Sequence, residues 1–227
     1  DTKKRKFRPG KLLTIFYIVF VMLFIYLGMW QIDRGNEKTQ MISEFELNKS
    51  KKPQSLSNNS KKWERIYVKG TWDSSRQMLL DNVIHNGRSG LKVITPILIE
   101  DKNEIVLVDR GWIERPINRA KLPNINIQDK LVTISGILKS PELGLILSDE
   151  LISESWPKII QTSNIEIISP EFNEKVFPFL LIADPLFNES LDYIEIKPTT
   201  MLPEKHYGYA ITWFTMGIIL TAMFMLR

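Results

Sequence analysis

Two long apolar runs stand near the two ends of this 227-residue chain. The first, residues 12–30, contains no charged side chain, and the second, residues 207–226, is uncharged and similarly long. A helix of about 19 residues spans about 28 Å at ~1.5 Å per residue, which is close to the ~30 Å hydrocarbon core of a bilayer. The pattern therefore predicts two transmembrane helices, over residues 12–30 and 206–226.

A cleaved signal peptide is the alternative interpretation of the first run. Its apolar core would be ~7–15 residues long and would lead to a cleavage site with small side chains. The run here is longer and passes into GMWQIDRGNEK, where bulky residues stand in place of small ones. An uncleaved anchor is therefore favoured.

The pattern changes twice between the two apolar runs. Residues 36–49 predict a helix that continues the first membrane helix outward, whereas residues 50–62 are polar and lack apolar periodicity. A short helix is expected over residues 169–175, where Ser169 can cap it and Pro170 suits its first turn. Elsewhere, period-two alternation and β-branched runs predict strands over residues 64–72, 76–82, 91–99, 104–112, 131–138, 177–183 and 193–197.

These elements together predict a membrane protein. Two transmembrane α-helices bracket a mainly antiparallel β (α+β) extramembrane domain, residues 31–205, built as a compact sheet or a small barrel. Because the chain has no cysteine, this domain must fold on its own core. The same absence excludes thiol redox chemistry, thiolate metal sites and cysteine nucleophiles.

The distribution of charge predicts the orientation in the membrane. Residues 1–11 carry six basic side chains and one acidic one, whereas the flank beyond the first run is mixed. The positive-inside rule therefore places this basic tail and the C-terminus in the cytoplasm and the central domain in the periplasm of a bacterial inner membrane. The mitochondrial inner membrane is the less favoured location. The net charge of +4 is thus a topology signal, and no nucleic-acid partner is expected.

Few residues could support catalysis. The chain has two histidines, and it contains no GxSxG, HExxH or SxxK motif and no glycine-rich phosphate loop. His85 lies in NVIHNGRSG, which is predicted to be an exposed hairpin tip. A membrane-tethered hydrolase would need this histidine beside a nucleophilic serine. The sequence therefore gives no positive case for an enzyme.

The second histidine, His206, stands where PEKHYGYAITWF leads into the last apolar run. An iron porphyrin needs an axial nitrogen, apolar walls and positive charge for its propionates, and the surroundings expected for His206 offer all three. The alternative is that these side chains only anchor the helices in the headgroup region. His206 shares a helical face with Ala210, Trp213 and Gly217. On the first helix, Gly28, Trp30 and Gln31 reach the same outer depth, and Arg34 stands one turn higher.

A segment at the end of a predicted strand, VDRGWIERP (residues 108–116), allows two interpretations. In the structural one, Gly111 permits a bulge and Trp112 covers the core. In the functional one, Arg110 binds an anion at the membrane surface. The physical argument favours the structural interpretation.

Six segments spread along the chain carry a family resemblance. They are GMWQIDRGNEK, VKGTWDSSRQMLLDN, GLKVITPILI, VLVDRGWIERP, the pair Trp156-Pro157, and PEKHYGYAITWF. In this order, with two helices bracketing a β-rich domain, they resemble the surfeit locus protein family of cytochrome c oxidase assembly factors nearly from end to end. The stretch 50–62 departs from this pattern, which leaves a partner-docking role there unassigned.

The resemblance implies a non-catalytic helper in the maturation of haem-copper cytochrome c oxidase. Such a protein would bind haem a as transient cargo and aid its insertion into the large membrane subunit of the oxidase. Other assembly or haem-synthesis proteins are further candidate partners. The alternative is a haem-independent membrane scaffold that stabilises an oxidase subunit during assembly.

The resemblance also implies roles for particular residues. The candidate ligand to the haem iron corresponds to His206, and the family's Trp-Gln pair corresponds to Trp30 and Gln31, which would line the site. On this hypothesis Trp213 and Trp30 pack on the macrocycle. A propionate of the haem would pair with a nearby cation, Arg34 or Arg110.

Overall fold

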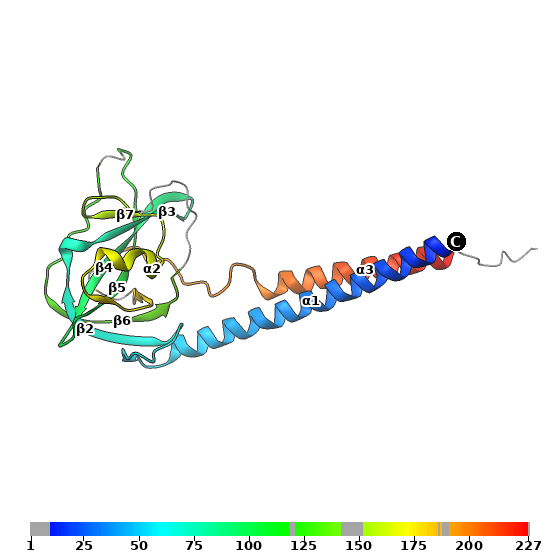
Figure 1. Ribbon diagram of the computed structural model, residues 1–227, viewed down its shortest axis with the longest axis horizontal. Helices are drawn as coiled ribbons and strands as arrows, with labels where there is room; N and C mark the ends of the chain where they lie inside the picture. The colour runs from blue at the N-terminus through cyan, green and yellow to red at the C-terminus, as the bar shows by residue number, and fades with distance from the viewer. Residues whose placement is uncertain (1–9, 119–120, 142–151, 186, 188–190, 227) are drawn as a thin grey trace, which may run out of the picture. The chain divides into compact units, whose positions relative to one another are not determined.

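The computed structural model describes residues 10–118, 121–141, 152–185, 187 and 191–226 (Figure 1). The chain divides into two compact units. One consists of Asp1–Glu46 together with Lys197–Arg227, and its described residues are mainly helical. The other, Leu47–Ile196, is rich in β-structure among its described residues.

Two apolar helices make up the helical unit. Helix α1, Lys11–Ser50, is uninterrupted, so residues 36–49 continue the apolar run as one helix. Helix α3, Pro203–Leu226, begins with proline in its first turn, where a missing N–H costs no hydrogen bond. By length and composition, both helices could cross a membrane. The two apolar helices therefore flank the β-rich unit in the sequence, as predicted.

The two helices pack along a regular seam, and Figure 1 shows α3, in orange to red, beside the first half of α1. Positions on the seam alternate at intervals of four and three residues, the spacing of a left-handed coiled coil. On α1 these positions are Tyr17, Val21, Phe24, Gly28, Gln31 and Gly35. On α3 they are Tyr207, Ala210, Phe214, Gly217, Thr221 and Phe224.

Two glycines allow the helices to approach closely. A Cβ at Gly28 would collide with the ring of Phe214, and a Cβ at Gly35 would collide with the ring of Tyr207. Each aromatic ring therefore occupies the space that a side chain would fill if the glycine opposite it were replaced by another residue. Small residues at such an interface let helices pack closely in a bilayer, where apolar lipid gives no hydrophobic drive for association.

The β-rich unit contains a closed ring of strands among its described residues. The pairings run β2–β6–β9–β5–β4 and return to β2, and all of these are antiparallel except β5–β9. Closure removes exposed strand edges. The members of the ring are β2 (Arg65–Trp72), β4 (Arg88–Ile99), β5 (Glu104–Glu114), β6 (Leu131–Lys139) and β9 (Leu180–Ala183).

The interior of this barrel is filled by alternate side chains of the ring strands. Ile66 and Val68 of β2 lie at most 2% exposed and face Val106 and Val108 of β5, which are fully buried, within one apolar cluster. Trp72 closes the cluster at the end of β2. Period-two alternation in the sequence thus corresponds to the inner and outer faces of the barrel.

Shorter elements extend the sheet beyond the ring. Strand β3 (Met78–His85) pairs with β4 and carries β7 in parallel on its other side. The remaining elements are β1 (Gln54–Ser55), η1 (Ser74–Arg76), β7 (Lys158–Ile160), α2 (Ile165–Ile168), η2 (Ser169–Glu171) and β8 (Lys175–Val176).

Two sequence predictions for this unit were wrong. Residues 193–197 form no strand, because the pairing of this segment with β5 ends at Asp192, which bridges to Trp112. The helix expected over residues 169–175 instead lies at Ile165–Ile168, where the side chain of Asn164 accepts a hydrogen bond from the N–H of Glu166 and caps it. Residues 169–171 form only a 3₁₀ turn.

Candidate functional site

His206 lies in the first turn of α3 and contacts α1. Its Nδ1 is 2.8 Å from Oε1 of Gln31. Because an amide oxygen only accepts hydrogen bonds, Nδ1 must carry the proton that is shared with Gln31. In the neutral ring, Nε2 then carries a lone pair and no hydrogen.

The other ring nitrogen of His206 has no partner. Nε2 is buried and makes no hydrogen bond, a property that it shares among the described side chains only with Nε1 of Trp72. A buried polar atom without a partner costs about 1–3 kcal/mol, so its presence calls for an explanation. Imidazoles that bind metals commonly have one nitrogen fixed by a hydrogen bond and the other free as the ligand.

An aromatic pair lies one heptad deeper along the same pair of helices. The rings of Trp213 and Phe24 are stacked with centroids 5.9 Å apart. Trp213 follows His206 by seven residues, and Phe24 precedes Gln31 by seven, so the two pairs occupy equivalent positions about 10 Å apart along the axis. The structure thus places Trp213 on the side of α3 that carries His206, as the spacing predicts.

Trp30 and Arg34 form a second group on α1. The guanidinium carbon of Arg34 lies 5.8 Å from the centroid of the Trp30 ring, and its NH1 lies 2.6 Å from Oε2 of Glu37. The hydrogen bond from Arg34 and its positive charge lower the pKa of Glu37. Since this ion pair is about half exposed on both sides, it contributes little and could be exchanged for another anion.

A comparison with known protein families decides what this chain is related to. The model of the SURF1 family matches residues 18–218, which include most of α1, most of α3 and the whole β-rich unit. The chain belongs to the SURF1 family. This confirms the resemblance that the sequence segments carry.

Several relatives agree with the family match. A SURF1-like protein of Monosiga brevicollis is 24% identical, with 87% of this chain and 80% of the relative covered. Surfeit locus protein 1 of Xenopus tropicalis is 23% identical over 83% of this chain and 66% of the relative. Cytochrome oxidase assembly protein SHY1 of Saccharomyces cerevisiae is 30% identical over 50% of this chain and 31% of the relative.

Arg110 of this SURF1-family chain lies inside the β-rich unit. It is 4% exposed, and its NH1 donates to Oε1 of Gln77 and to the carbonyl of Ile125, both at 3.1 Å. Next to it, Gly111 has a φ of +121°, and the register of β4 and β5 shifts at this point. The structure therefore supports the structural interpretation, a bulge, and gives Arg110 the role of joining three segments of the unit.

His85 lies at the end of β3 and belongs to no catalytic group that the structure describes. Its ring meets the edge of Trp112 at a centroid distance of 5.4 Å, and its Nε2 lies 3.3 Å from the side-chain nitrogen of Asn86. Among the described residues, no group of three or more His, Cys, Asp or Glu side chains could hold a metal ion. The hairpin tip predicted from the sequence is confirmed, because Asn86 and Gly87 form the turn between β3 and β4.

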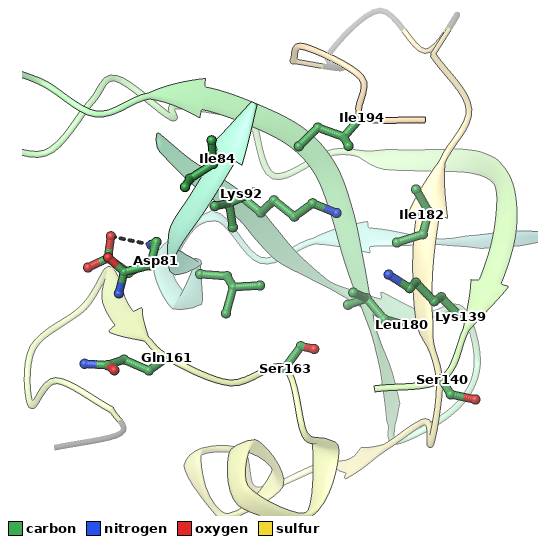
Figure 2. A pocket seen from close by; sticks show the side chains of 13 residues that line it. Asp81, Ile84, Lys92, Lys139, Ser140, Gln161, Ser163, Leu180, Ile182 and Ile194 are labelled. Atoms are coloured by element: carbon green, nitrogen blue, oxygen red, sulfur yellow. Dashed lines mark hydrogen bonds between the residues drawn. The ribbon is translucent and has the colours of Figure 1, made fainter. Parts of the chain in front are cut away.

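A cavity of about 300 Å³ opens on the β-rich unit of this SURF1-family protein (Figure 2). Lys92 and Lys139 line it from different strands, together with apolar side chains that include Leu180 and Ile182. The Lys92 ammonium lies 2.6 Å from the buried carboxylate of Asp109. The sequence did not predict this cavity, because its lining comes from six separate segments of the chain.

Proposed function

We propose that this protein is a membrane-anchored assembly factor for cytochrome c oxidase that holds haem a as transient cargo on His206. Membership of the SURF1 family and a relative named as a cytochrome oxidase assembly protein support the assembly role. The large membrane subunit of the oxidase is the proposed recipient of the haem. Other assembly or haem-synthesis proteins are proposed as further partners.

The state of His206 is the observation that carries the haem proposal. Nε2 is buried without a partner, while Nδ1 is held by Gln31 at 2.8 Å. A haem iron already has four porphyrin nitrogens and needs one axial donor of this kind. Trp213 and Trp30 would contact the macrocycle, and Arg34 would exchange Glu37 for a propionate.

The proposed setting is the inner membrane of a bacterial cell, with α1 and α3 crossing the bilayer. The basic residues of 1–11 and the uncharged runs in both helices support an orientation with both termini in the cytoplasm. The β-rich unit would then lie in the periplasm. In this orientation His206, at the start of α3, would lie at the outer boundary of the hydrocarbon core.

Haem retention by the full-length protein tests the proposal. The protein is purified in detergent from cells that make haem a, and Soret absorbance and haem per protein are measured for wild type, His206→Ala and His85→Ala. We expect the first variant to lose the chromophore and the second to keep it. Equal haem content in wild type and His206→Ala would remove His206 from this role.

A haem-independent scaffold is the second candidate, because the name of the Saccharomyces cerevisiae relative states cytochrome oxidase assembly alone. It predicts that the oxidase subunit co-purifies with the protein and that no chromophore does. It also predicts that His206→Ala leaves this complex intact. The same preparations therefore distinguish the two candidates.

A further inference from the structure

Gln31 touches the nitrogen of His206 that is not available to a metal. We propose that Gln31 is a positioning residue that fixes the tautomer of His206 and, as a neutral amide, keeps its bond to haem iron weak enough for release. The tautomer follows from the contact itself, whereas the effect on release rests on the proposed haem function.

The contact favours one of the two tautomers of the neutral ring. Oε1 of Gln31 can only accept, so of these two it stabilises the one with hydrogen on Nδ1 and the lone pair on Nε2. The opposite tautomer would place two acceptors 2.8 Å apart unless the amide turned its NH2 toward Nδ1, and in either case it would leave a buried N–H at Nε2 without an acceptor. The unpaired N–H is unfavourable, so the ring is held ready to donate its lone pair from Nε2.

The helix seam fixes the position from which Gln31 acts. On α1 it lies midway between Gly28 and Gly35, which receive the rings of Phe214 and Tyr207. The hydroxyl of Tyr207 also donates to Oδ1 of Asn36 at 2.9 Å. Because α1 and α3 are locked on both sides of Gln31, its amide is held against the imidazole by packing and not by a flexible loop.

The chemistry of the acceptor sets the strength of the ligand. Histidines that bind metals often donate their second N–H to a carboxylate, which raises the basicity of the ligating nitrogen. A hydrogen bond to a charged acceptor is roughly twice as strong as one to a neutral acceptor. An amide at position 31 therefore orients the ring with a smaller increase in basicity, which suits cargo that must leave.

Nitrogen NMR of the haem-free protein tests the tautomer directly. The chain has two histidines, so His85→Asn leaves His206 as the single histidine in full-length protein labelled with ¹⁵N-histidine. We expect a protonated Nδ1 and an unprotonated Nε2, and a mixture of tautomers after the further change Gln31→Leu. A protonated Nε2 in the parent protein, or a spectrum that Gln31→Leu does not alter, would overturn the inference.

Haem binding and release test the second part. Changes to residues that support a metal ligand typically cost about 10–100-fold in affinity, and we expect a loss of this size for Gln31→Leu. Gln31→Glu keeps the length and an acceptor, so we expect slower haem a dissociation and a higher iron–histidine stretching frequency by resonance Raman. Gln40→Leu is the matched control, because Gln40 is an exposed glutamine on α1 that pairs with Glu44 at 2.9 Å.

The outcomes separate this inference from the proposed function. If His206→Ala retains haem, the haem proposal fails, while the tautomer measurement still stands by itself. If His206→Ala loses haem but Gln31→Leu and Gln31→Glu keep the stretching frequency and dissociation rate of the wild type, Gln31 does not position the ligand. In that case only the haem proposal survives.

Discussion

Replacing Lys92 by methionine would leave a buried carboxylate without its cation. The side chain of Asp109 is 1% exposed, and the Lys92 ammonium lies 2.6 Å from its Oδ2. Its Oδ1 accepts one hydrogen bond, from the N–H of Gly111 at 2.9 Å. Removing one partner of a buried ion pair costs about 3–5 kcal/mol, because the remaining charge is uncompensated. Methionine keeps most of the apolar stem of lysine, so little of the expected loss comes from packing.

An exposed ion pair of the same kind provides the control. Lys69 lies 2.8 Å from Glu100, and the two side chains are 52% and 38% exposed. Because water and salt screen such a pair, Lys69→Met should cost about 0–1 kcal/mol. The double variant Lys92→Met/Asp109→Asn removes both buried charges and should recover much of the stability that Lys92→Met loses.

Urea unfolding of the full-length protein in detergent, followed by tryptophan fluorescence, measures these differences. With a slope of about 1–3 kcal/mol per M, the expected loss for Lys92→Met lowers the unfolding midpoint by at least ~1 M. Equal small shifts for Lys92→Met and Lys69→Met would refute the reasoning. So would a double variant that is as unstable as Lys92→Met.

Two further predictions concern the helix seam and the acid stability of the β-rich unit. Gly28→Leu should separate α1 from α3, because a side chain at position 28 meets the ring of Phe214. A side chain at Gly208 meets nothing within 4 Å, so Gly208→Leu is the control. Spin-label distances between the two helices should increase for Gly28→Leu and not for Gly208→Leu. Arg76 donates two 2.8 Å hydrogen bonds to Glu174 and lowers the pKa of Glu174 from 4.5 to about 2. Because the pKa of Glu174 is lower in the folded state than in the unfolded state, the ion pair stabilises the folded protein fully above pH 4.5. This stabilisation is lost as the pH falls toward 2. The urea midpoint should therefore fall less between pH 5 and pH 2.5 in Glu174→Gln than in wild type, and parallel pH curves would contradict this assignment.

Local sequence patterns were sufficient to predict the long helices and strands of the fold. The run over residues 12–30 and residues 36–49 both have the composition of helix, and nothing between them breaks it, so α1 continues through both. The long strands of the barrel have eight or more residues with either alternation, as in β2, or a nearly continuous apolar run, as in β4 and β5, and β2, β4, β5 and β6 were predicted to within a few residues. Strands β1, β7 and β8 have two or three residues and pair in parallel with distant segments, so no local period could indicate them.

The segment after Asp192 shows why the same reasoning fails elsewhere. Tyr193–Lys197 alternates apolar and polar residues as a strand does, and Ile196 is buried at 8% exposure. Its backbone nevertheless has no strand partner among the described residues, because the antiparallel bridge to β5 is confined to Asp192. Alternation reports which side chains are buried, but a strand also needs a neighbouring strand with free hydrogen-bonding groups.

In the candidate site, too, local spacing predicted some placements, whereas contacts between distant segments could not be predicted. Helical spacing alone placed Trp213 on the side of α3 that carries His206, because residues seven apart share a face. His206 and Gln31 are 175 positions apart in the chain. Their contact depends on the register in which α1 packs against α3, and no local sequence pattern contains that register. The sequence left two interpretations of Arg110 open for a related reason. Its partners inside the β-rich unit are Gln77 and the carbonyl of Ile125, and both come from other segments of the chain.

The donor set around His206 fits the proposed haem cargo better than it fits a bare metal ion. A copper or zinc ion held by protein alone needs three or four side-chain ligands, commonly Cys and His. The chain has no cysteine, and its described residues contain no group of three or more His, Cys, Asp or Glu side chains that could hold an ion. A porphyrin supplies four nitrogen donors itself, so one oriented imidazole and an aromatic neighbour are enough to hold the iron. A single protein ligand also means that one broken bond releases the cargo, which is the requirement for a protein that passes haem to another.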